Sequence, residues 1–202
     1  MGNSMRQFVI LGHDVQTDGD FSLDNLTGVG RVDLLARCVT ASLLLSHGIR
    51  ESVRTHLVLA DEFTVRFDGS SLRGLHPDER STAALIRNAL EEQAKAIGHV
   101  PVETSPGVTL VRRGFEETLE ALADAGTPVL LHEDGSPAGE TAPPADPVFV
   151  LSDHQEFTQD ERQVCERLTT QTVRLGPRAV HADHAITVAH NWCDTDGFTV
   201  YS

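Results

Sequence analysis

Three charged residues stand together where a helix is predicted to begin. Arg31, Asp33 and Arg37 follow the glycine-rich approach 27–30. Asp33 and Arg37 are four residues apart and share one helix face, so an ion pair on a solvated surface would explain these two. An arginine at a helix start opposes the helix dipole, which indicates that something other than helix stability placed Arg31 there.

Three more arginines surround turns: Arg66 and Arg73 flank one, and Arg80 begins a helix. Arginine forks onto phosphates and stacks on bases, so these positions favour a polyanion. The net charge of −14, from 30 acidic and 16 basic residues, argues the other way. However, Lys95 is the only lysine. Such a surface is typical of proteins from organisms with molar internal salt, where the screening length is about 3 Å. The charge therefore leaves two alternatives: a protein that binds nucleic acid through these arginines, or an ordinary acidic enzyme with no polyanion partner.

Three predicted strands in the C-terminal half end in polar or glycine-containing loops, after Leu131, Leu151 and Leu175. Ligands of open parallel sheets bind outside the carboxyl ends of the strands. Main-chain groups there could bind an adenine edge, and Gly176 would allow a close approach. Ordinary β-to-α turns are the alternative, which the spacing alone favours.

Histidines near the C-terminus raise a metal site as a further possibility. His181 and His184 would share a helix face, but His190 lies too far along for the same site. A surface or capping role is favoured, and no metal is expected. The cysteines Cys38, Cys165 and Cys193 lack metal-ligand or disulfide spacing and are expected to be reduced thiols.

These residues require an α/β scaffold. The short runs are too apolar for one-sided burial, which predicts one domain over 5–202 with a mainly parallel sheet covered by helices on both faces. Residues 1–4 are interpreted as an addition ahead of a natural start at Met5. No signal peptide or membrane span is indicated, so a cytoplasmic location is expected. Strands are predicted over 7–15, 55–60, 63–67, 128–131, 148–151 and 172–175, helices over 32–46, 77–98, 115–125, 158–168 and 181–192, and a proline-rich surface loop over 136–147.

Five segments resemble, in order, the archaeal tRNA pseudouridine N1-methyltransferase family (TrmY). They are GVGRVDLLARCVTASLLLSHGIR from Gly28, LRGLHPDERS, LLHEDG, LSDHQEFT and LGPRAVHADHAI. The resemblance implies a SPOUT fold with a C-terminal trefoil knot, a homodimer, S-adenosylmethionine as the cofactor, and methylation of N1 of pseudouridine 54 in the TΨC loop of tRNA. Relatives often carry a cysteine where this chain has Ala185, so a catalytic thiol there is not available.

The resemblance also assigns site residues. The three loops of the knot would bind the cofactor through Leu131, His132, Leu151, Ser152, Asp153, Leu175, Gly176, Pro177, Ala179, Val180, His181 and Ala182. Asp33 would orient or accept the N1 proton, with Arg31 beside it. Arg37, Arg66, Arg73 and Arg80 would hold substrate RNA. Three alternatives remain: a small-subunit rRNA pseudouridine N1-methyltransferase, a non-catalytic SPOUT-like RNA-binding protein and, last, a metal-dependent hydrolase.

Overall fold

Eight strands form one central sheet in a computed structural model that describes residues 4–201. The strand order is β10-β8-β9-β1-β4-β5-β7-β6. Strands β10, β8, β9, β1 and β4 are parallel, whereas β5, β7 and β6 extend the sheet in antiparallel fashion. Their bounds are β1 Arg6–Gly12, β4 Val53–Leu59, β5 Phe63–Asp68, β6 Val102–Ser105, β7 Val108–Val111, β8 Thr127–Pro137, β9 Pro147–Leu151 and β10 Gln171–Arg174.

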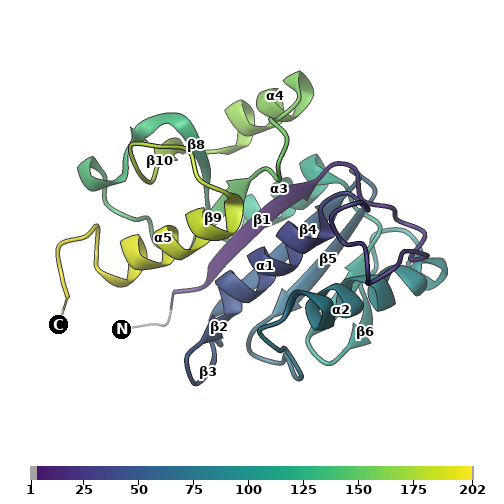
Figure 1. Ribbon diagram of the computed structural model, residues 1–202. Helices are drawn as coiled ribbons and strands as arrows, with labels where there is room; N and C mark the ends of the chain where they lie inside the picture. The colour runs from purple at the N-terminus through teal and green to yellow at the C-terminus, as the bar shows by residue number, and fades with distance from the viewer. Residues whose placement is uncertain (1–3, 202) are drawn as a thin grey trace.

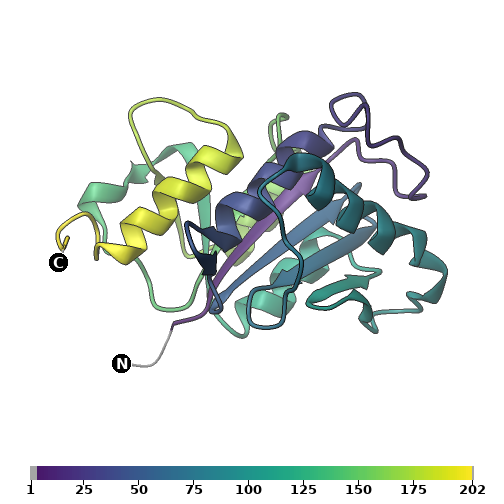
Figure 2. The same cartoon turned by 60° about the horizontal axis from the view of Figure 1, so that its bottom comes forward.

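Helices cover both faces of this sheet (Figure 1). Helices α1, α2 and α5 pack on one face, and α3 and α4 pack on the other, which gives two separate apolar clusters. Figure 2 shows α1 and α5 side by side along the first face. The bounds are α1 Val32–Leu43, α2 Glu79–Glu91, α3 Phe115–Ala123, α4 Gln159–Leu168 and α5 Ala182–Asp194. The predicted α/β class with a mainly parallel sheet is confirmed.

Strand register explains where a site can form. Ile10 on β1 pairs with Leu151 on β9, and Leu130 on β8 pairs with Val150. β1 and β9 therefore end at the same edge of the sheet, and the segments that follow them meet there. β8 continues beyond Leu130 to Pro137, and its last residues pair with β10. The side chain of Thr158 accepts from the main-chain N–H of Glu161, and that of Glu161 accepts from the N–H of Thr158. This confirms the capping box predicted at the start of α4, which contributes about 1 kcal/mol to helix stability.

Several predicted boundaries were wrong. Helix α1 stops three residues before Ser46, because its next residues form β2 (Leu44–Leu45), which pairs with β3 (Gly48–Ile49). Pro77 is not the first residue of α2; Asp78 caps that helix by accepting from the main-chain N–H of Ser81. The helix also ends well before Gly98, in a short 3-10 turn, η1 (Gln93–Lys95).

Two other segments differ from expectation. The hairpin of β6 and β7 was not predicted, because two four-residue strands leave little periodicity to detect. The expected loop 136–147 begins late, since β8 continues to Pro137 and a 3-10 turn, η2 (Ala138–Glu140), follows. Of the predicted four-residue addition, 1–3 lie outside the described residues, and Ser4 exchanges hydrogen bonds with Asp146.

Candidate active site

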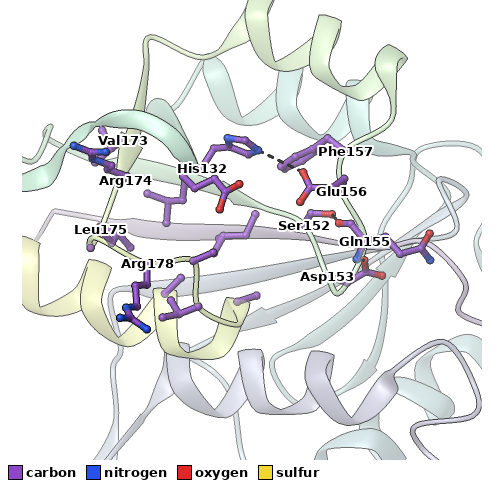
Figure 3. Close-up of a pocket in the computed structure, with 18 residues that line it drawn as sticks. His132, Ser152, Asp153, Gln155, Glu156, Phe157, Val173, Arg174, Leu175 and Arg178 are labelled. Atoms are coloured by element: carbon purple, nitrogen blue, oxygen red, sulfur yellow. Dashed lines mark hydrogen bonds and ion pairs between the residues drawn. The ribbon is translucent and has the colours of Figure 1, made fainter.

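A pocket opens beside the middle of β8 and at the carboxyl ends of β9 and β10 (Figure 3). The three segments predicted to converge do meet here, but the first is not a loop, because β8 continues from Leu131 to Pro137. Ten of the twelve residues predicted to bind the cofactor line the pocket: Leu131, His132, Leu151, Ser152, Asp153, Leu175, Gly176, Ala179, Val180 and Ala182. Pro177 and His181 do not line it; His181 is the N-cap residue of α5. The binding role of the ten stays a prediction, but their convergence is an observation.

The pocket combines an apolar floor with charged edges. Leu131 and Leu151 are largely buried beneath it. Glu133 and Glu156 supply negative charge, and Arg174 and Arg178 supply positive charge. The prediction missed these four, together with Gln155, Phe157, Val173 and Ala185, although all lie within a few positions of predicted residues. Extending each predicted loop by several residues would have found most of them.

Glycine at position 176 leaves open space. A Cβ atom built on Gly176 would meet no atom within 4 Å, and its backbone is not in the left-handed region. The protein itself therefore does not require glycine there. The predicted close approach of a ligand stays a prediction.

The loop that follows β9 is held in shape by its own polar groups. The main-chain N–H of Gln155 donates to Asp153 at 2.8 Å, and the Ser152 hydroxyl donates to the carbonyl of Gln155. The amide of Gln155 donates to Asp14 at 2.6 Å, which ties the loop to the segment after β1. These contacts fix the main-chain groups that face the pocket.

His13, also from the segment after β1, contacts two carboxylates. Its Nδ1 lies 3.0 Å from Asp153 and its Nε2 lies 3.2 Å from Glu161 on α4. The hydrogen bond to Asp153, opposed by burial and aided by the hydrogen bond to Glu161, raises the pKa of His13 to about 9. Burial would raise the pKa of Asp153, but the hydrogen bond from the His13 ring, together with those from the main-chain N–H groups of Gln155 and His13, lowers it overall. Sequence reasoning missed His13 because no local spacing connects it to partners 140 and 148 residues away.

Asp33 lies at the start of α1 beneath two arginines. Arg31 donates from Nε and Nη2 to both carboxylate oxygens at 2.9 and 3.0 Å, and Arg37 donates to one of them at 3.0 Å. Burial would raise the pKa of Asp33, but the hydrogen bonds from Arg31 and then Arg37 lower it overall. A carboxylate stabilised in this way binds a proton weakly and is therefore a poor general base.

This cluster borders the pocket without lining it. Arg37 also donates to Asp183 on α5 at 3.1 Å and to Glu79 on α2 at 3.0 Å. Asp183 directly follows Ala182, a pocket residue. Asp153, another pocket residue, is near enough to Arg31 for its negative charge to contribute to the raised pKa of Arg31, although the hydrogen bond to Asp33 is the main cause. Arg31 itself adopts a left-handed backbone with φ 58°, an uncommon and costly conformation for arginine.

The four arginines assigned to RNA are not gathered on one surface. Arg37 is occupied by three carboxylates, and Arg80 pairs with Asp24. Arg66 and Arg73 have no carboxylate partner among residues 4–201. Arg66 lies on the opposite face of β5 from Phe63, Val65 and Phe67, which pack under α1 and α2. Within the same range Arg113, Arg174 and Arg178 also lack a carboxylate partner.

The C-terminal histidines are not arranged around a metal. Within residues 4–201 no group of three or more histidine, cysteine, aspartate or glutamate side chains could hold an ion. Burial lowers the pKa of His190 to about 3, and its Nε2 donates to the carbonyl of Ser42 at 2.9 Å. His190 is thus a neutral residue of the core.

Comparison with known proteins defines the class. Residues 5–198 match the model of a family described as "Putative SAM-dependent RNA methyltransferase". A solved structure shares the fold: that of Archaeoglobus fulgidus Nep1 bound to S-adenosylhomocysteine aligns with a TM-score of 0.63 at 11% identity, over 94% of this chain and 97% of that one. The chain belongs to this family of S-adenosylmethionine-dependent RNA methyltransferases. The trefoil knot stays a prediction.

Similar proteins with a named activity define the resemblance more closely. The chain is 63% identical to the tRNA (pseudouridine(54)-N(1))-methyltransferase of Haloarcula marismortui, over 98% of this chain and all of that protein. It is 58% identical to the protein of the same name from Haloferax volcanii, over the same shares. Both organisms are haloarchaea, in agreement with the salt-adapted composition.

No helix within residues 4–201 is long and apolar enough to cross a membrane.

Proposed function

We propose that this protein transfers a methyl group from S-adenosylmethionine to N1 of pseudouridine 54 in tRNA. The similarity that carries the proposal is 63% identity, end to end, to a relative named for that reaction. The pocket suits the cofactor chemically. Leu131 and Leu151 offer an apolar floor for an adenine ring, and Glu133 and Glu156 offer negative charge to a sulfonium and an ammonium group.

The cofactor supplies an electrophilic methyl carbon, so the protein chiefly has to position the target base and help it lose one proton. We assign Arg31 to the carbonyl edge of the target, where its guanidinium would stabilise the anion left as N1 loses its proton. Asp33 holds Arg31 in place through two hydrogen bonds. Because its pKa is lowered, Asp33 acts in this proposal by orienting Arg31, and the proton leaves through water.

The direct test of function is methylation of defined transcripts. A tRNA carrying pseudouridine 54 should gain one methyl group on that nucleoside in molar salt, as measured by nucleoside mass spectrometry. The same tRNA carrying uridine 54 should gain none, because carbon occupies the position of the nucleophilic nitrogen. Methylation of a small-subunit rRNA fragment in preference to tRNA would replace this assignment with the rRNA alternative. Cofactor binding without methylation of either RNA would indicate a non-catalytic binding protein.

Substrate RNA requires cations that are not already paired. We assign this role to Arg174 and Arg178 at the pocket edge. Arg66 and Arg73 would make more distant contacts with the RNA. Arg37 and Arg80 are already paired with carboxylates and would stabilise the fold instead. Arg178 is exposed and has no carboxylate partner among residues 4–201, so its guanidinium can bind a phosphate without first breaking an ion pair.

Replacing Arg178 with alanine should weaken tRNA binding about tenfold and reduce the slope of log affinity against log salt by about 1. Filter binding over a salt series measures both quantities. The matched control is Arg87→Ala on α2, where the arginine already pairs with Glu91, and this variant should bind like the wild type. Equal losses in the two variants would mean that Arg178 contributes only to overall charge.

The active protein is proposed to be a cytoplasmic homodimer. Val180 supports this assignment, because it is a large apolar side chain, 54% exposed, at the edge of the pocket. A second subunit would cover it and close the site. Sedimentation equilibrium in molar salt should give twice the monomer mass, and a monomer with full activity would remove the dimer from the proposal.

A further inference from the structure

The pocket loop is supported from behind by a single imidazole ring. Strands β1 and β9 are parallel neighbours, so His13 after β1 lies next to Asp153 after β9. The Asp153 side chain is fully buried. It accepts the main-chain N–H of His13 at 2.9 Å in addition to the contact with the ring. The segment after β1 thus supports the first residues of the pocket loop.

The same ring reaches the other end of that loop. Glu161, 3.2 Å from His13 Nε2, also accepts the main-chain N–H of Thr158 at 2.7 Å. Asp153 and Thr158 bracket three residues that line the pocket, Gln155, Glu156 and Phe157, and Ser152, a further lining residue, directly precedes Asp153. Fixing both ends of a short segment limits the positions that its main chain can adopt. His13 therefore spans the loop without touching the pocket itself.

We propose that His13, donating from both ring nitrogens to Asp153 and Glu161, is a positioning residue that holds the loop 152–158 in the shape that binds the cofactor. This role rests on the proposed function and adds to it a residue outside the pocket. No motif of the sequence indicated it.

The charge state of His13 decides whether the bridge holds. An imidazolium donates from both nitrogens, whereas neutral imidazole donates from only one. If the neutral ring kept its bond to Asp153, the lone pair on Nε2 would face Glu161, and an attraction would become a repulsion. The raised pKa of about 9 keeps the ring charged at neutral pH.

The other charged or ionisable groups near His13 are carboxylates, one arginine and one further imidazole. Asp61, from the turn after β4, lines the same small cavity as His13 and accepts the main-chain N–H of Phe115. Asp14 is bound by Gln155, and Arg31 keeps its charge. The imidazole of His154 is the other one in the loop, and its Nδ1 lies 3.6 Å from Asp153. Because these groups are all present in a variant that lacks only His13, comparison with that variant assigns a loss of affinity at alkaline pH to His13.

Calorimetry with S-adenosylhomocysteine as the probe tests this role in the full chain at molar salt. The variant His13→Asn keeps a donor near the position of Nδ1 but loses the charge and the contact with Glu161. Near neutral pH it should bind about tenfold more weakly than the wild type. At about pH 10 the two affinities should converge, because the wild-type ring is then neutral. The ligand's amino group titrates equally in both measurements and cancels from their ratio.

A matched control is His47→Asn, which removes an exposed histidine from the turn between β2 and β3 and should leave the affinity unchanged at each pH. A second variant, Glu161→Gln, keeps an acceptor for Thr158 and removes one negative charge from the ring. It should shift the alkaline loss of affinity downward by about one pH unit. A purely structural His13 would lower the melting temperature of the variant without this pH profile.

The outcomes separate two failures. Equal affinity of wild type and His13→Asn near neutral pH would overturn the positioning role and leave the function intact. If His13→Asn does not fold, an unshifted profile in Glu161→Gln would overturn the role instead. Absence of binding by the wild type at every pH would overturn the proposed function, and the positioning role with it.

Discussion

Two buried carboxylates lie at the pocket, Asp153 in its lining and Asp33 at its border, and they have different counter-ions. Asp33 at the start of α1 is held by the guanidinium groups of Arg31 and Arg37, whereas Asp153 after β9 is held by the imidazole of His13. Arginine stays charged at every pH that the fold survives, but histidine can lose its charge. The first cluster is therefore permanent, and the second depends on pH.

The two clusters also join different elements of the structure. The Asp33 cluster joins three helices, because Arg37 also contacts Asp183 on α5 and Glu79 on α2. The Asp153 cluster joins a strand end, a pocket loop and α4. One fixes packing between helices, and the other fixes a loop only a few residues long. Substitutions in the first should thus affect stability and catalysis together.

The largest effect is expected from Asp33→Ala. Two partly buried guanidinium groups would lose their shared partner, which should lower the free energy of unfolding by about 3 kcal/mol. Single-turnover methylation should slow about 100-fold, because Arg31 would no longer be held toward the target. Chemical denaturation and rapid-quench kinetics in molar salt measure the two effects.

The control for this variant is Glu79→Gln. Glu79 contacts the same arginine, but its side chain is 45% exposed, so the loss should stay below about 1 kcal/mol. Wild-type single-turnover kinetics in Asp33→Ala, with the fold intact, would show that the cluster has no part in the reaction.

A smaller and pH-dependent effect is expected from the second cluster. The pKa of His13 is raised to about 9 in the folded protein, from about 6.5 when unfolded. Its contribution to stability is therefore complete below about pH 6.5 and is lost as the pH rises through about 9. The loss should be at most about 3 kcal/mol, since each pKa unit corresponds to about 1.4 kcal/mol. Thermal unfolding followed by circular dichroism should show this decline in the wild type and not in His13→Asn.

The same decline should persist in Asp33→Ala, because that variant keeps His13 and both of its carboxylates. Parallel pH profiles in wild type and His13→Asn would instead place the alkaline transition on another group, and the contrast between the clusters would disappear.

These clusters also mark the limit of prediction from sequence. Apolar runs and the Thr158 capping box are local signals, and they correctly predicted the parallel strands, the start of α4 and the segments that meet at the pocket. They did not predict that β8 continues beyond Leu131. Asp33 and Arg37 were paired correctly because helix geometry fixes neighbours four residues apart. His13 and Asp153 meet only because β1 and β9 are neighbours in the sheet, which no local pattern specifies. Contacts between residues on neighbouring strands depend on the order of strands in the sheet, and the spacing of residues along the chain does not specify that order.

The smallest effect is expected from Arg31→Lys, which separates charge from geometry. Lysine keeps the positive charge but cannot place two donors on both oxygens of Asp33. Stability should fall by about 1 kcal/mol, with no new dependence on pH near neutrality. Arg167→Lys, in an exposed pair with Glu116, is the control and should change stability by less than about 0.5 kcal/mol. If Arg31→Lys is as stable as the wild type, charge alone holds Asp33, and the two clusters differ only in whether their cation titrates.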